Sequence, residues 1–388
     1  MNTNHRGIFL RAPALGLLAL CLGTAGLRAQ SNTFQQTNLD SDLPGMAKFT
    51  DPDLVNPWGI VASSGSPFWI SDNGTGLSTL YGGTGVKNTG LIVTIPPPTG
   101  GTPPAAPTGV VFNGSSSSFG GAHFIFDTED GTIAAWSGGS SAALKVDNSG
   151  TGAVYKGLAI GNNGSGNFLY ATNFNSGKID VYNSSFAPTT LSGTFTDPTL
   201  PAGYAPFNIE NIGGKLYVTY ALQDSAKHDD VGGAGHGYID VYDLNGNMLQ
   251  RLVSNGPLDS PWGLAMAPTG FGPFGGDLLV GNFGSGLIDA FNPTSGAFLG
   301  MLMDPSSTPI SIDGLWGLSF GNGAGSGSTN NLYFTAGIAG PDSTEDHGLF
   351  GDLSHVPDAG SSLLMAGAAL AGLLLAGRGL TQARNART

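Results

Sequence analysis

The side chains able to do chemistry in this 388-residue chain are carboxylates, amides and histidines, and many lie in two long polar segments. Residues 221–237 read ALQDSAKHDDVGGAGHG, and residues 336–348 read AGIAGPDSTEDHG. Long connections of this kind in a compact domain are often functional. A histidine beside an aspartate can supply a general base. His228 and Asp229 are therefore the candidate catalytic pair.

Further polar residues stand at the ends of apolar, strand-like segments, where oxygen ligands suit Ca²⁺. Glu210 is notable because the chain has only three glutamates and this one lies inside a predicted strand. A buried lone carboxylate is costly, so Glu210 needs either a cation or Lys156 as its partner. Taken singly, each Asp or Asn can instead cap its own turn. The predicted ligand-binding residues are Asp72, Asn73, Asn173, Asn208, Glu210, Asn282 and Asp313; the predicted metal ligands among them are Glu210, Asp72, Asn173 and Asn282.

No enzyme signature is found in the sequence. There is no HExxH, no GxSxG with a placed histidine and no Walker loop. Cys21, the single cysteine, lies in a segment predicted to be removed, so no disulfide is expected. These observations favour binding over catalysis.

Composition and charge restrict the fold and the partners. Gly (64) and Pro (24) are abundant, and the acids are almost all Asp, which suits turns better than helix interiors. With 40% hydrophobic residues, the chain is predicted to be an all-β protein of short strands and tight turns. Between Asp40 and Asp358, 8 bases face all 27 acids, a formal charge of −19. Such a surface repels nucleic acid.

A repeat of about 50 residues defines the elements that position these side chains. Each unit begins with a six-residue segment whose third residue is Gly, or Asn in the fourth unit, and whose remaining residues start an apolar strand. The six segments are PWGIVA, PTGVVF, YKGLAI, PFNIEN, PWGLAM and LWGLSF. Six units of four strands predict a six-bladed β-propeller. The sixth unit lacks a fourth strand, so Phe34–Leu39 is predicted to pair with His347–Leu353 and close the ring. The fourth strand of the third unit is predicted at Leu191–Phe195, and Trp58, Trp262 and Trp316 are predicted to pack between blades.

Propeller topology also predicts which polar residues share a face. Residues just before the innermost strand of a blade lie on the same face as residues just after its second strand. The two long segments are lids on that face. Besides the candidates above, the face is predicted to carry Asn56, Lys156, Ser260, Asp127, Glu129 and Asp224.

The two ends are predicted to lie outside the propeller, which spans residues 30–354. Residues 1–29 resemble a secretory signal, with basic residues before an apolar run. Residues 355–388 contain an uncharged stretch at 361–377, at the short limit for crossing a bilayer, followed by arginines that would lie in the cytoplasm. This segment can be a plain tail anchor. Its motif VPDAG (Val356, Pro357, Asp358 and Gly360 at the informative positions) resembles the VPDSG-like variant of bacterial PEP-CTERM sorting tails.

The resemblance to the PEP-CTERM class implies a partner and a location. In that class a membrane exosortase cleaves near the motif, and the protein passes from the cytoplasmic membrane to the cell surface or extracellular matrix. The segments SGKIDVY and HGYIDVY resemble NHL-type six-bladed propellers. The stretch from Phe34 to Leu353 resembles a bacterial family of secreted propellers without an established activity, through segments such as DPDLVNPWGI and PISIDGLWGLSFGNG.

Two functions remain open from the sequence. The first is a surface-displayed binding module for a polysaccharide or protein. The second is a Ca²⁺-dependent hydrolase that resembles the gluconolactonase and paraoxonase propellers, with its site in the funnel.

Overall fold

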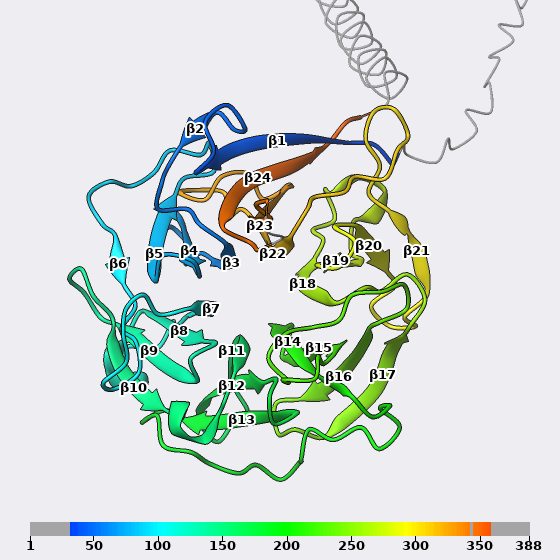
Figure 1. Ribbon diagram of the computed structural model, residues 1–388. Coiled ribbons are helices and arrows are strands. Elements are labelled where there is room, and N and C mark those ends of the chain that lie inside the picture. The colour runs from blue at the N-terminus through cyan, green and yellow to red at the C-terminus, as the bar shows by residue number, and fades with distance from the viewer. Residues whose placement is uncertain (1–31, 342–343, 358–388) are drawn as a thin grey trace, which may run out of the picture.

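The computed structural model describes residues 32–341 and 344–357, which form a closed ring of six β-sheets around a central axis (Figure 1). In each blade the first strand lies innermost and the later strands follow outward. Short 3₁₀ turns at Phe119–Gly121, Ser149–Thr151 and Gly272–Phe274 are the only helical segments of this described part. The predicted all-β, six-bladed propeller is confirmed.

Each of the first three blades starts at the axis and extends outward. Blade 1 contains β3 (Pro57–Val61), β4 (Phe68–Asp72), β5 (Leu77–Tyr81) and β6 (Val93–Thr94). Blade 2 contains β7 (Pro107–Phe112), β8 (Phe124–Thr128), β9 (Thr132–Trp136) and β10 (Ala143–Asp147). Blade 3 contains β11 (Tyr155–Asn162), β12 (Asn167–Asn173) and β13 (Lys178–Asn183).

The other three blades include the one that joins the two ends of the domain. Blade 4 contains β14 (Tyr204–Ile212), β15 (Lys215–Leu222), β16 (Tyr238–Asp243) and β17 (Met248–Ser254). Blade 5 contains β18 (Pro261–Met266), β19 (Leu278–Asn282), β20 (Ile288–Phe291) and β21 (Phe298–Met301). Blade 6 contains β22 (Leu315–Phe320), β23 (Asn331–Ile338), β24 (His347–His355) and β1 (Phe34–Ser41), beside which β2 (Phe49–Thr50) runs parallel.

The N-terminal strand closes the ring, as the strand count predicts. β1 pairs antiparallel with β24, with Phe34 opposite His355 and Gln36 opposite Leu353 (Figure 1). Phe34 is fully buried and stacks on Phe271, with ring centroids 4.8 Å apart. This pairing leaves β24 without an open edge and ties the first residues of the propeller to the last.

The predicted fourth strand of blade 3 is wrong, and this blade has three strands. The backbone of residues 191–195 bonds to the neighbouring blade instead: Gly193 N donates to Asn245 O (2.8 Å) and Phe195 N to Gly246 O (3.0 Å). Those two acceptors lie in the turn between β16 and β17. The segment is therefore held by blade 4 and does not pair along β13.

The core lies between neighbouring blades and at the axis. Trp69 on β4, for example, stacks on Phe124 of β8 with centroids 4.0 Å apart. The repeated glycine has the predicted role of allowing close approach, since a Cβ at Gly59 would lie 2.5 Å from Thr108 O on the next inner strand.

The three repeat tryptophans meet at the axis and close it. Trp58 stacks on Trp316 at 3.5 Å between centroids, and Trp262 packs edge-on to both at 6.0 and 5.8 Å. All three are at most 4% exposed. The prediction that they pack between blades is confirmed. We refer to Trp58, Trp262 and Trp316 as the tryptophan plug.

The predicted signal segment (residues 1–29), the apolar stretch (361–377), Asp358 and Gly360 lie outside the described residues. Val356 and Pro357 follow β24, and Val356 N donates to Thr33 O (2.8 Å). Within residues 32–341 and 344–357, no helix has the length and apolar character needed to span a membrane.

Candidate functional site on the lid face

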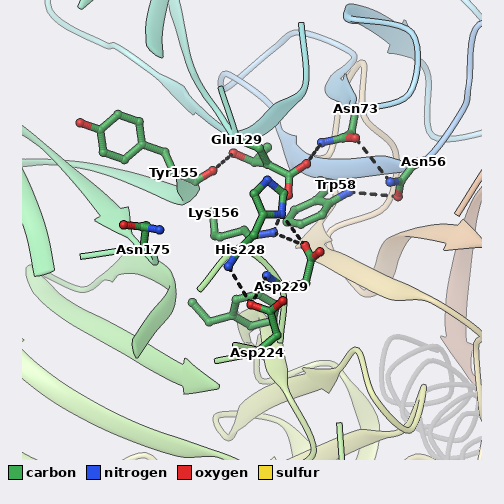
Figure 2. Close-up of polar contacts among 12 residues, drawn as sticks. Asn56, Trp58, Asn73, Glu129, Tyr155, Lys156, Asn175, Asp224, His228 and Asp229 are labelled. Atoms are coloured by element: carbon green, nitrogen blue, oxygen red, sulfur yellow. Dashed lines mark hydrogen bonds and ion pairs between the residues drawn. The ribbon is translucent and has the colours of Figure 1, made fainter. Parts of the chain in front are cut away.

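A buried lysine occupies the centre of the lid face. Lys156 is at the start of β11 and its side chain is 2% exposed. Its Nζ forms an ion pair with Glu129 and a second with Asp229 Oδ1 at 3.2 Å (Figure 2). Burial opposes the ammonium charge, but the two carboxylates outweigh it and raise the pKa of Lys156. The side chain is therefore a permanent internal cation at neutral pH.

The tryptophan plug contacts both the ammonium and the backbone of this lysine. Lys156 Nζ lies 5.1 Å from the ring centroid of Trp58, within range of a cation–π contact. Trp262 Nε1 donates to Lys156 O (2.9 Å). The aromatic groups thus fix both the backbone and the ammonium of Lys156.

A chain of amides connects the plug to Glu129 (Figure 2). Asn56 Oδ1 accepts from Trp58 Nε1 (3.0 Å) and Trp316 Nε1 (3.1 Å). Asn73 Nδ2 donates to Glu129 Oε2 (2.8 Å), and Asn56 Nδ2 lies 3.5 Å from Asn73 Oδ1. Asn56 has φ 44°, a backbone region that Asn adopts more readily than most residues. Local backbone geometry and side-chain bonding therefore both favour Asn at this position.

The long connection between β15 and β16 brings the candidate catalytic pair to the same place. His228 Nδ1 lies 2.9 Å from Asp229 Oδ1, and Asp224 Oδ1 accepts from His228 N (2.9 Å). The bond to His228 is the main cause of a lowered pKa at Asp229, and the same bond raises the pKa of His228. The carboxylate orients the imidazole, the arrangement that a general base uses.

Two further acids, Asp230 and Glu345, lie close enough to the lysine and its partners to interact with them electrostatically. Burial and then the neighbouring Glu129, Asp230 and Asp229 raise the pKa of Glu345 to about 7. Burial also raises the pKa of Asp230. Four carboxyl groups thus surround one lysine. We define the lid-face site as Asn73, Glu129, Lys156, His228, Asp229, Asp230 and Glu345.

Three of the four predicted metal ligands form bonds inside their own blades instead. Each accepts from or donates to the residue seven positions later, on the third strand. Asp72 Oδ2 accepts from Thr79 Oγ1 (2.7 Å), Asn173 Nδ2 donates to Asp180 Oδ2 (3.0 Å), and Asn282 Nδ2 donates to Asp289 Oδ2 (2.8 Å). These side chains are at most 6% exposed. The structure does not bring them together around one point with Glu210.

The remaining predicted ligand residues are distributed over the axis and the surface. Asn73 is in the lid-face site, whereas Asn208 Nδ2 donates to Trp262 O (2.8 Å) inside the plug. Asp313 is exposed. Glu210 lies beyond the plug in the central channel. The alternative ion pair between Glu210 and Lys156 is not formed, because Lys156 pairs with Glu129 and Asp229.

Sequence reasoning placed Lys156 and Glu129 on the correct face but did not identify them as partners. A usable signal was present: Lys156 is the only basic residue at the start of an inner strand. A buried lysine requires an acid, and the acids after the second strands share its face.

The donor set of this site fits Ca²⁺ poorly. Ligand atoms of Glu129, His228 and Asp229 all lie within 4.8 Å of one another. However, Lys156 Nζ already binds two of these groups, and the third is an imidazole, whereas Ca²⁺ takes oxygen ligands. These groups are therefore arranged around the ammonium of Lys156 and suit it better than they suit a calcium ion.

Comparison with solved structures supports the fold. A protein of unknown function from Bacteroides thetaiotaomicron has a TM-score of 0.51 and 8% identity, over 82% of this chain and 73% of that one. At this identity the likeness shows the architecture alone. The predicted propeller fold is consistent with it.

Comparison of sequences identifies relatives in a virus. No family model matches the chain. Uncharacterized protein R648 of Acanthamoeba polyphaga mimivirus is 34% identical over 332 residues, covering 81% of this chain and 79% of the viral protein. Uncharacterized protein L690 of the same virus is 34% identical over 313 residues, covering 76% and 80%. These relatives are viral, and the resemblance to a bacterial family with a sorting tail stays a prediction. The chain belongs to the protein family that contains mimivirus proteins R648 and L690.

Proposed function

We propose that this chain is an exported, surface-displayed propeller that acts as a binding module through the lid-face site. One observation carries the proposal: Lys156 is the only lysine in a group of four carboxyl groups, of which Glu129 and Asp229 bind it and Asp230 and Glu345 lie beside them. A site of this kind attracts positively charged, donor-rich groups. The ligand we favour is an amine-bearing extracellular polymer.

Binding to amine-bearing and neutral oligosaccharides tests this proposal. Chitosan oligosaccharide is expected to bind the described domain, whereas dextran oligosaccharide of matched length is not. Glu345→Gln combined with Asp230→Asn should weaken chitosan binding at least tenfold, because the excess carboxylates are removed. Asp147→Asn, an exposed acid on the outer strand of blade 2, is the matched control and should leave binding unchanged. Equal binding of both sugars, or no effect of the double variant, would contradict the proposal.

A hydrolase is the second candidate, and the His228–Asp229 pair is the observation in its favour. A screen of lactones and phosphotriesters with wild type and His228→Ala would detect it. Calorimetry with Ca²⁺ on wild type and Lys156→Met would show whether a cation can replace the ammonium. Turnover that is lost in His228→Ala would establish the hydrolase in place of a pure binding module.

Display at the surface rests on the C-terminal motif and on an exosortase-type partner. Replacement of Pro357-Asp358 by Ala-Ala should leave the protein in the cytoplasmic membrane if a sorting protease acts at this motif. Fractionation of cells that carry such a protease measures the effect. Equal surface display of both proteins would reduce the tail to an ordinary anchor.

A further inference from the structure

The central channel on the other side of the tryptophan plug contains a single charged group. The channel has a volume of about 360 Å³ and is lined by the second halves of all six inner strands, so it lies towards the face opposite the lids. Its size falls within the range of small-molecule sites. Nothing in the lid-face site uses this space.

Glu210 stands where the other blades carry small or apolar residues. It is placed two residues after the third position of its repeat. At the same position the other five strands carry Val61, Val111, Ala159, Ala265 and Ser319, and all of them line the channel. Glu210 is the only ionisable residue among the lining residues. It is therefore one carboxylate in a ring that is otherwise almost entirely apolar.

No basic residue in the described ranges pairs with the carboxylate of Glu210. Among the described residues, no hydrogen bond or ion pair of its side chain is found, although it is accessible within the channel. Glu210 is exposed to the channel, but its position inside the ring of strands desolvates the carboxylate and raises its pKa to about 7. Above that pH the channel holds a negative charge that no other lining residue neutralises.

The polar space next to Glu210 is small. A second cavity of about 30 Å³, lined by Asn208, Trp262 and Glu210, continues towards the plug. It has room for a water molecule or a compact polar group. A Ca²⁺ ion needs six to eight oxygen ligands, and this end of the channel offers one carboxylate. An ammonium head needs only one carboxylate and a few acceptors.

We infer that the channel is a binding site for a small organic ammonium with a slim apolar body, held by an ion pair with Glu210. The apolar body lies against the ring of inner strands, and the head points towards the plug. This site is on the opposite side of the plug from the lid-face site and does not depend on the function proposed there.

Titration calorimetry at pH 8 with n-hexylammonium, and with hexanol for comparison, tests the inference. Hexylammonium should bind wild type at least ten times more tightly than Glu210→Gln. Hexanol, which has the same apolar body without the charge, should not distinguish the two proteins. Asp147→Asn, a change of an exposed acid on the outer strand of blade 2, is the control and should retain wild-type binding of hexylammonium. A loss smaller than tenfold in Glu210→Gln, or no binding by wild type, would overturn the inference.

The protonation of Glu210 supplies a second, independent readout. Hexylammonium stays protonated between pH 6 and pH 8, whereas Glu210 ionises in this range. Binding should therefore tighten as the pH rises, and the dependence should vanish in Glu210→Gln. Thermal melting at pH 6 and pH 8 checks that the variant folds, and Glu210→Gln should keep a cooperative transition at both pH values. Binding that is independent of pH in wild type would also overturn the inference.

Discussion

Replacement of Lys156 by Met is expected to destabilise the propeller strongly although it preserves the volume and the apolar stem of the side chain. Lys156 is 2% exposed and its ammonium is bound by Glu129, which is 14% exposed, and by Asp229, which is 66% exposed. Removal of the cation leaves Glu129 buried without its counter-charge. It also increases the repulsion among Glu129, Asp229 and Glu345.

The magnitude follows from the exposure of each partner. Removal of one partner of a buried ion pair typically costs about 3–5 kcal/mol. The bond to Asp229 contributes no more than about 1 kcal/mol, because a largely exposed pair is screened by solvent. Glu129 keeps its bond from Asn73 at 2.8 Å, which places the total near the lower limit, at about 3 kcal/mol. For a domain of this size we expect a fall in Tm of about 6 °C.

Urea unfolding followed by circular dichroism measures this change, and a double-mutant cycle assigns it. Glu129→Gln in the Lys156→Met background should recover about 1–3 kcal/mol, because the uncompensated charge disappears. Lys178→Met is the matched control: this lysine is in the same blade but exposed, and should change stability by less than about 0.5 kcal/mol. A loss below about 1 kcal/mol in Lys156→Met, or no recovery in the double variant, would refute the ion-pair reasoning.

Three further predictions concern ring closure, the plug and the acid excess. Phe34→Ala should lower the free energy of unfolding by about 3–5 kcal/mol, measured in urea, because Phe34 is fully buried in the closing blade; the 46% exposed Phe298→Ala should change it little. Asn56→Ala should cost about 2 kcal/mol or more and shift tryptophan fluorescence, because two buried indole N–H groups lose their acceptor. Glu345→Gln should stabilise the protein by up to about 3 kcal/mol at pH 8 and have no effect at pH 4, because the raised pKa of about 7 penalises only the ionised carboxylate. Thermal melts at both pH values measure this, and the same shift in Tm at pH 4 and pH 8 would contradict it.

The repeat pattern was sufficient to predict the architecture because each blade is encoded locally. The glycine in third place marks the inner strand, and a Cβ at Gly109 or Gly317 would lie 2.5 Å from the neighbouring strand's backbone. Strand counting was sufficient to predict the pairing of β1 with β24, since one incomplete blade and one spare strand leave a single way to close the ring. The exception was the third blade, where Gly193 and Phe195 bond to a turn of blade 4, a contact between blades that no local pattern shows.

The sequence by itself determined the face on which the polar residues meet, and the tertiary structure decided their partners. Propeller topology places Lys156, Glu129 and Asp229 at one mouth, because strand direction alternates within each blade. Whether an Asn or Asp then points to the axis depends on neighbours up to a blade away. Asp72, Asn173 and Asn282 turn into their own blades to bond the third strand, and Glu210 faces the channel beyond the plug. The physical reason is that a side chain's direction is set by packing around the axis, where all six blades contribute at once.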